Sequence, residues 1–211
     1  MGTDSKGVID TMSRLVQHFF IAILASLVLL PAAHLSAAAQ MKRKYNFGAR
    51  KLTFDAAKYA PRIVDYTTDE KPGTIIINTR RRYLYLVLGN GKAKRYGIGV
   101  GRAGFQWSGE AHVGRKQEWP DWHPPKEMIE REWKKYKRKL PEKMKGGPDN
   151  PLGARAMYLF QGNRDTLYRI HGTNAPWSIG RAVSSGCIRL RNEDVIDLYK
   201  RVKVGAKVIV K

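Results

Sequence analysis

One stretch of twenty residues directs the interpretation of this chain: HGTNAPWSIGRAVSSGCIRL, from His171 to Leu190. It begins at the end of a predicted β-strand and contains Cys187, the only cysteine among 211 residues. His171 precedes Cys187 by sixteen positions, and a loop of that length can return to the same end of a sheet. We therefore predict that imidazole and thiol lie side by side as base and nucleophile. An inert buried thiol and an intermolecular disulfide are the alternative interpretations of a lone cysteine.

The residues around the cysteine suit acyl transfer. Three small residues precede it, namely Ser184, Ser185 and Gly186. Their consecutive backbone N–H groups can turn toward one point and stabilise an oxyanion. Arg189 alternates with apolar neighbours, so we expect it on the cysteine's face, where it lowers the pKa of the thiol and binds a substrate carboxylate. We interpret Arg191 as surface charge.

Other candidate residues carry weaker signals. Tyr158 and Trp177 are predicted to line the cleft, with core packing as the alternative. His112 lies in a predicted strand and His123 in a proline-containing loop, so neither competes with His171 as the base.

The pattern of the whole chain favours a mainly β fold of the α+β type, with a mixed or antiparallel sheet and one or two helices. Alternating and β-branched runs predict strands at residues 74–78, 83–88, 95–100, 157–160, 167–170 and 206–210. Prolines bound a predicted helix at residues 125–139. A second helix is predicted to begin with Asn192 as its cap and to end at Gly205. No repeat, P-loop or dinucleotide-binding motif is present.

The first 39 residues are predicted to be a secretory signal peptide, because basic, apolar and small residues follow one another in that order. An uncleaved membrane anchor is the alternative. We interpret residues 40–71 as a basic lead-in that spaces the domain from the membrane or packs on its flank, and residues 72–211 as the domain. In either case we expect the domain to be exported, which disfavours cytosolic functions.

Charge gives a second constraint. The chain has 39 Lys and Arg against 18 Asp and Glu, a formal net charge of +21. Such a field favours acidic partners, and export disfavours nucleic acid among them. The densest basic run, Lys134 to Lys139, is predicted to be a solvated helix face, with a docking patch as the alternative.

At this point the residues resemble a known family. HGT, SIG and SSGCIRL, together with GTIIINTRRRYLYLV and YGIGVGRAGFQWSG, resemble the L,D-transpeptidases with a YkuD-type catalytic domain, over residues 72–211. The resemblance implies a bacterial periplasmic enzyme of peptidoglycan, and we expect no metal or cofactor. Cys187 would attack a stem tetrapeptide and release D-alanine, His171 would serve as base and acid, and the carbonyl of Gly172 would orient the imidazole. A stem amine would then give a 3→3 cross-link, water a carboxypeptidase reaction, and a wall-attached protein an anchored product.

One departure from the family's common motif stands beside the nucleophile. Ser185 occupies the place of a frequent histidine, so we expect an altered acceptor preference and retained chemistry. Two other classes of function stay open: a non-catalytic basic module that binds the wall, which the net charge favours, and a zinc enzyme with Cys187 and His171 as ligands.

Overall fold

The computed structural model describes residues 56–103 and 107–211. The predicted signal peptide or anchor, residues 1–39, and the first part of the lead-in lie outside the described residues. Within the described ranges, no helix has both the length and the apolar character needed to cross a bilayer.

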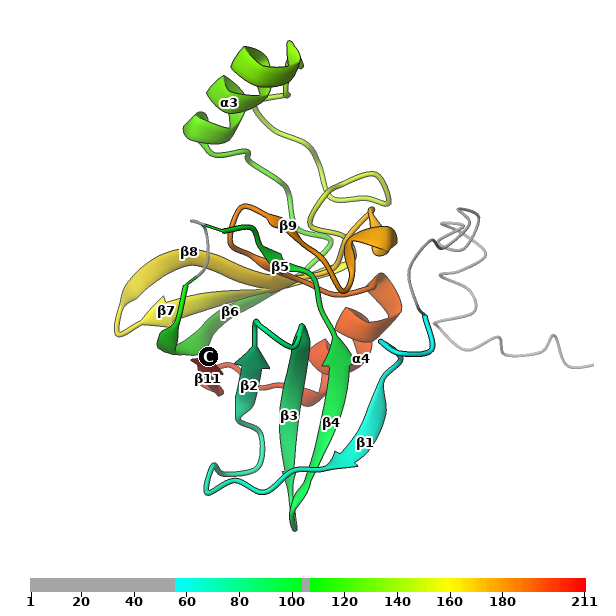
Figure 1. Ribbon diagram of the computed structural model, residues 1–211. Helices are drawn as coiled ribbons and strands as arrows, with labels where there is room; N and C mark the ends of the chain where they lie inside the picture. Colours follow the sequence, from blue (N-terminus) through cyan, green and yellow to red (C-terminus); the bar gives the residue numbers. More distant parts are fainter. Residues whose placement is uncertain (1–55, 104–106) are drawn as a thin grey trace, which may run out of the picture. The chain divides into compact units, whose positions relative to one another are not determined.

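The described residues form a mainly β fold with two α-helices (Figure 1). In chain order the elements are β1 (Arg62–Asp65), β2 (Ile75–Asn78), β3 (Tyr83–Gly89), β4 (Lys92–Gly97), β5 (Val100–Gly101), β6 (Gly109–Glu118), α3 (Lys126–Tyr136), β7 (Arg155–Gln161), β8 (Arg164–His171), the 3₁₀ turn η1 (Pro176–Ser178), β9 (Ala182–Ser184), β10 (Ile188–Arg189), α4 (Asn192–Arg201) and β11 (Lys207–Val210).

Nine of these strands make one mixed sheet in the order β1-β4-β3-β2-β11-β6-β7-β8-β10. Neighbouring strands are antiparallel except at two places, where β11 runs parallel to β2 and β10 runs parallel to β8. β5 and β9 form a separate parallel pair. The second parallel contact matters most for function, because it brings the segment after the cysteine alongside the strand that ends on His171.

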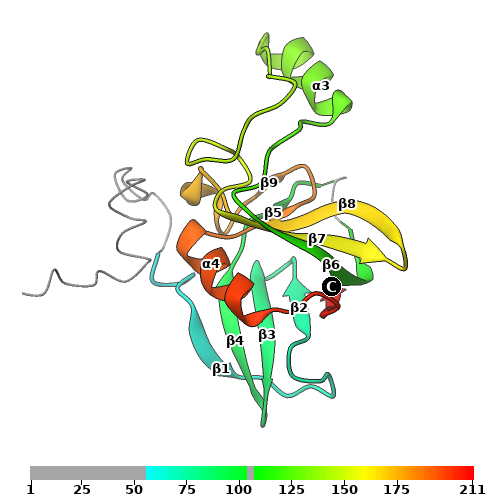
Figure 2. The same cartoon turned by 180° about the vertical axis from the view of Figure 1, so that it is seen from behind.

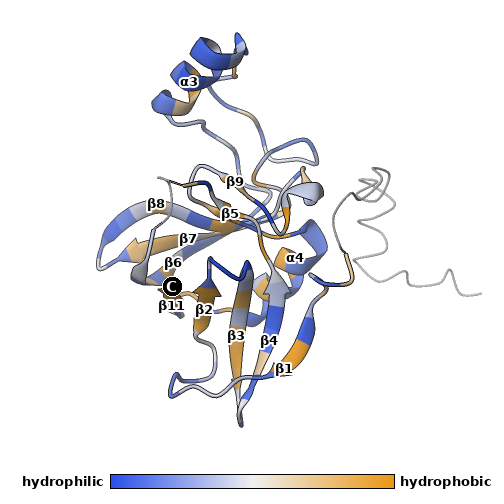
Figure 3. Cartoon of the chain, in the orientation of Figure 1, coloured by the Kyte–Doolittle hydropathy of each residue, from blue (hydrophilic) through white to orange (hydrophobic). Residues whose placement is uncertain are grey.

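The main core lies between the sheet and α4. Alternation along β2 places Ile75 and Ile77 in this core and Ile76 in a smaller cluster with Tyr85. From α4, Val195 and Leu198 enter the main core, and both are fully buried. Figure 2 shows α4 against the strands from behind, and Figure 3 shows apolar colouring along β2 and β3 and hydrophilic colouring over much of α3.

The structure confirms the predicted strands and both helices in outline, and it corrects their details. The predicted cap residue Asn192 lies inside α4, with Arg191 at the N-cap. Its buried side chain instead accepts from Ala154 N at 2.9 Å and donates to Thr173 O at 3.1 Å. The helix ends at Arg201, before the predicted stop at Gly205. The side chain of Asn192 therefore binds distant backbone groups instead of capping the helix, and a local sequence pattern does not reveal such tertiary hydrogen bonds.

The folded part also begins before Pro72. β1 pairs with β4 from Arg62↔Arg95 to Asp65↔Lys92, so four residues of the predicted lead-in form an edge strand of the sheet. This pairing realises the alternative in which the lead-in packs on the flank of the domain.

Candidate active site

The parallel pairing of β8 and β10 places the two key residues. Ile188 lies opposite Ile170, and Arg189 lies opposite His171. Cys187 immediately precedes β10 and is therefore level with Arg169. Because side chains alternate along a strand, His171 and Arg169 share the face of the sheet opposite to buried Ile170. The sequence stretch thus folds so that the base ends β8 and the nucleophile directly precedes the adjacent strand β10, with an offset of two residues in register.

His171 is held in one orientation. Its Nδ1 lies 2.5 Å from Gly172 O, and only an N–H at this nitrogen can donate to the carbonyl, so Nε2 is left as the acceptor. The side chain is 3% exposed. Burial, followed by the nearby Arg189 charge, lowers the pKa of His171 to about 3. The imidazole is therefore neutral at pH 7, which is the form a general base requires.

Cys187 is a free, half-buried thiol whose Sγ lies 3.9 Å from Leu167 O. Burial raises the pKa of this thiol, and the backbone N–H and the charge of Arg169, followed by the charge of Arg189, offset only part of that shift. The sequence prediction of a lowered pKa is thus wrong in its net direction, because desolvation outweighs the arginines. The resting site holds a neutral thiol beside a neutral imidazole.

Among the described residues, the thiol contacts the backbone carbonyl of Leu167, the imidazole interacts with the backbone of Gly172 and Leu152, and no hydrogen bond joins thiol and imidazole. Catalytic hydrogen bonds often tighten only when substrate binds, so this geometry is compatible with proton transfer in a complex.

The turn before the cysteine is built from its own small residues. Ser184 Oγ donates to Cys187 O at 2.7 Å, and Gly186 N donates to Ser184 Oγ at 3.2 Å. Gly186 has φ +113°, in the left-handed region that favours glycine. Because the Gly186 N–H is already used inside the turn, an oxyanion donor has to come from another N–H, such as that of Cys187 itself. Ser185 Oγ accepts from Arg131 Nη2 of α3 at 3.3 Å.

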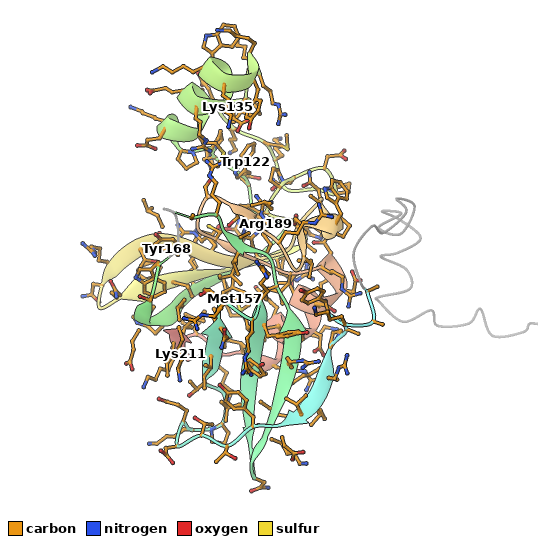
Figure 4. All side chains as sticks on the ribbon, in the orientation of Figure 1. Trp122, Lys135, Met157, Tyr168, Arg189 and Lys211 are labelled. Atoms are coloured by element: carbon orange, nitrogen blue, oxygen red, sulfur yellow. The ribbon has the colours of Figure 1, made fainter. Side chains whose placement is uncertain are left out.

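Of the other residues considered for the site, Arg189 lies on β10, Arg191 at the N-cap of α4 and Trp177 on η1. Arg189 faces His171 across the register, and its Nε is buried without a hydrogen-bond partner. In the view of Figure 4 it lies between Met157 of the sheet and Trp122. The interpretation of Arg191 as surface charge is wrong, because its side chain is only 14% exposed and is paired at 2.7 Å with the buried carboxylate of Asp194. Trp177 is half-buried on η1.

Sequence reasoning missed a row of cationic residues on the nucleophile's face. The registers align Arg115 of β6 with Tyr158 of β7, and Tyr158 with Arg169 of β8. The guanidinium carbons lie 3.7 and 4.3 Å from the centre of the Tyr158 ring. Two hydrogen bonds to Asp165, at 2.6 and 2.8 Å, fix Arg169. The available signal was the position of Arg169 two residues before His171, which puts both on one face of a strand.

The described residues contain no group of three or more His, Cys, Asp or Glu side chains that could hold a metal ion. The set of groups at this site is one thiol, one imidazole and several guanidiniums. Such a set suits nucleophilic chemistry on a substrate that carries negative charge.

Fold and site together define a β-rich domain with a thiol and an oriented imidazole on adjacent strands. The family model of the L,D-transpeptidase catalytic domain, YkuD, matches residues 72–210, and the chain belongs to this family.

Comparison with curated proteins gives relatives of the same kind. The chain is 39% identical over 142 residues to the probable L,D-transpeptidase ErfK/SrfK of Salmonella typhimurium, which covers 65% of this chain and 43% of that protein. It is 38% identical over 140 residues to the probable L,D-transpeptidase YbiS of Escherichia coli, with 64% and 43% covered. The chain thus spans less than half of the length of these relatives.

A solved structure from Brucella melitensis is 50% identical over 79% of this chain and 98% of that one, with a TM-score of 0.49. It carries the name probable carnitine operon oxidoreductase caia, a description of that protein alone.

Proposed function

We propose that this chain is an L,D-transpeptidase that acts on peptidoglycan stem tetrapeptides through an acyl-enzyme on Cys187. The observation that supports the proposal is the pairing of β8, which ends on an Nδ1-anchored imidazole, with β10, which directly follows the only thiol of the chain. Membership of the YkuD family supports the reaction class.

Acylation follows from the resting protonation states. Nε2 of His171 takes the thiol proton as Sγ attacks the carbonyl carbon before the terminal D-alanine, and a C–S bond forms. The negative charge on the carbonyl oxygen is stabilised by backbone N–H groups of the turn and by the Arg189 guanidinium. The C–N bond then breaks, His171 returns the proton to the leaving amine, and D-alanine departs.

Deacylation reverses these roles. An amine on a second stem attacks the thioester, His171 accepts its proton, and the C–S bond breaks as the thiol is restored. The product is a 3→3 cross-link. With water as acceptor the same steps give a shortened stem, and with a protein amine they give attachment to the wall. We expect Ser185 to influence the choice of acceptor, because it lies beside the nucleophile and is bound to α3.

The neighbouring residues have supporting roles in this proposal. Gly172 orients the base, Ser184 and Gly186 shape the turn, and Arg189 binds a substrate carboxylate, with Tyr158 and Trp177 lining the cleft. Residues 1–39 support export, and therefore a periplasmic enzyme, with the stem peptides as partners. The chemistry proposed here uses no metal or cofactor.

The test is mass spectrometry of products after incubation of the protein with purified muropeptides bearing tetrapeptide stems. We expect loss of D-alanine, growth of a dimer and a transient thioester in the intact-mass spectrum. Cys187→Ala should abolish all three. His171→Gln should reduce the acylation rate by at least about a hundredfold, since general-base catalysis typically contributes 10²–10⁴.

The controls separate loss of chemistry from loss of folding. Cys187→Ala removes one partly exposed thiol, so its unfolding midpoint should match the wild type. Loss of D-alanine without a dimer would assign carboxypeptidase activity. Retained turnover in Cys187→Ala, or a folded wild-type protein that forms neither product nor thioester, would overturn the proposal in favour of a wall-binding module.

A further inference from the structure

Three consecutive arginines, Arg80, Arg81 and Arg82, form the turn between β2 and β3, and the mechanism above does not use them. This connection is strongly hydrophilic in Figure 3 and lies at the end of the strands that faces β5 and β9. It borders an open groove with a volume of about 660 Å³. The groove is lined by Asn78, Thr79, the three arginines, Val100, Ala182 and Lys211, with no Asp or Glu side chain among them.

The arginine side chains of this groove have no partner among the residues that the structure describes. Within residues 56–103 and 107–211, the guanidiniums of the three arginines make no hydrogen bond or ion pair, and Arg82 Nε is buried without a partner. Two arginines elsewhere in the domain are paired with carboxylates. Arg169 is bound to Asp165 at 2.6 Å, and Arg201 to Asp197 at 3.0 Å. Gathering unpaired guanidiniums is electrostatically unfavourable unless an anion joins them.

The turn is held in place by its backbone. Arg81 N donates to Asn78 Oδ1 at 2.8 Å, and both the backbone N and the Oγ1 of Thr79 donate to Lys211 O, at 2.9 and 2.8 Å. Arg82 has φ +58°, and its carbonyl accepts from Ile98 N at 3.0 Å. The three side chains therefore project from a fixed frame, which reduces the entropy lost when they bind a ligand.

Backbone contacts connect the groove to β10, the strand that directly follows the nucleophile. Ile98, bound to Arg82, is followed by Gly99, whose N–H donates to Arg189 O at 2.9 Å. Two consecutive residues, Ile98 and Gly99, thus connect the arginine turn to β10 through backbone hydrogen bonds. Thr79 also lines a second, narrower pocket, which reaches Gly186 and Ile188 on either side of Cys187.

We propose that this groove is an anion subsite that binds carboxylates of a peptidoglycan stem peptide while Cys187 reacts with, or transfers, its acyl group. The inference rests on the proposed function and adds to it a recognition element outside the Cys187–His171 pair. Guanidinium groups match carboxylates in geometry and can bind them through two hydrogen bonds. The carboxylates can come from the acyl donor or from the acceptor stem, and the experiment distinguishes the two.

The first measurement is calorimetric binding of a purified tetrapeptide stem to the Cys187→Ala protein, which cannot turn it over. Adding Arg80→Gln, Arg81→Gln and Arg82→Gln should weaken binding by at least about tenfold, because each charge-assisted hydrogen bond is worth a tenfold factor or more. The same stem with its carboxylates amidated should bind both proteins equally. For the stem with free carboxylates, the difference in affinity between the Cys187→Ala protein and its triple glutamine variant should become smaller as the salt concentration is raised.

The matched control carries Lys134→Gln, Lys135→Gln and Lys139→Gln, which remove the same charge from α3 and the residues after it. This control should bind the stem like its parent. A second variant carries Arg80→Lys, Arg81→Lys and Arg82→Lys. It keeps the positive charges but loses the planar guanidinium groups that donate two hydrogen bonds, so it should bind the stem with intermediate affinity.

The source of the carboxylates follows from kinetics on proteins that keep Cys187. A raised KM for thioester formation in the glutamine variant assigns the groove to the donor. Unchanged thioester formation with a raised KM for the acceptor in dimer formation assigns it to the acceptor. Equal binding and equal kinetics in the folded variant would overturn the inference while leaving the proposed function intact. Failure of the wild type to form any thioester would overturn both.

Discussion

Two helices of nearly equal length, α3 with 11 residues and α4 with 10, occupy contrasting positions in the fold. Both carry acidic residues in the first turn and basic residues in the last turn, as the helix dipole favours. α4 buries Asn192, Asp194, Val195 and Leu198, whereas α3 buries none of its residues and leaves Trp133 and Tyr136 each 53% exposed. The two helices thus share favourable charges in their terminal turns, but only α4 packs its side chains into the core.

Each helix contacts one side of the candidate site. Asn192 of α4 binds Ala154 N and Thr173 O, which brackets the segment just after His171. Arg131 of α3 binds Ser185, two residues before Cys187. The base is supported by the core of the domain, while the nucleophile turn is contacted by a helix with little packing of its own. Mutations in the two helices should therefore separate stability from reactivity.

The largest expected difference is in folding stability. Leu198→Ala should lower the free energy of unfolding by about 2–5 kcal/mol, because it leaves a cavity in the main core. Trp133→Ala on α3 should change it by no more than about 0.5 kcal/mol, although it removes a larger side chain. Urea unfolding followed by circular dichroism measures both. A similar loss in the two variants would show that α3 is packed in solution.

Burial of His171, the base that lies at the end of β8, should make the folding stability depend on pH. The pKa of His171 is about 3 in the folded state, below the ordinary 6.5, so the unfolded chain binds the proton more readily between these values. The contribution of His171 to stability is present above pH 6.5 and falls by about 1.4 kcal/mol per pH unit as pH decreases from 6.5 toward 3.

The test compares His171→Gln with a matched His112→Gln variant by urea unfolding at pH 7, 6 and 5. The first variant should lose this slope relative to the wild type, and the second, which retains His171, should keep it. Parallel curves for all three proteins would contradict the burial of a neutral His171.

A smaller effect is expected at Asn192. Asn192→Ala leaves the buried Ala154 N–H and Thr173 C=O without partners, at a cost of about 1–3 kcal/mol. Because these groups adjoin the base, thioester formation should slow as well. Asn174→Ala is the matched control, since Asn174 makes one exposed hydrogen bond, to Asp149 O at 2.6 Å. An acylation rate in Asn192→Ala equal to that of the control would show that His171 does not depend on this support.

Local sequence patterns predicted a large part of the fold and of the candidate site. Periodicity predicted both helices and most strands, and the spacing of His171 and Cys187 predicted their proximity. The parallel pairing of β10 with β8 depends on contacts between distant segments, so it was not predicted beyond that proximity. Asn192 looked like a cap because its tertiary partners, Ala154 and Thr173, are invisible to local rules. The net direction of the Cys187 pKa depended on burial, which residue types alone do not give.

The smallest predicted effect tests the contact between α3 and the nucleophile turn. Arg131→Gln and Ser185→Ala should each leave stability within about 0.5 kcal/mol of the wild type, because one partly exposed hydrogen bond joins the two residues. Together they should show a coupling of about 0.5–1 kcal/mol in the activation free energy of transfer to an amine. A double-mutant cycle on the ratio of dimer to hydrolysed product measures this coupling. Since both residues lie outside the Cys187–His171 pair, thioester formation itself should change by less than about threefold. Strict additivity in the cycle would show that α3 does not act on acceptor choice through Ser185, and would leave that choice to groups on the sheet itself.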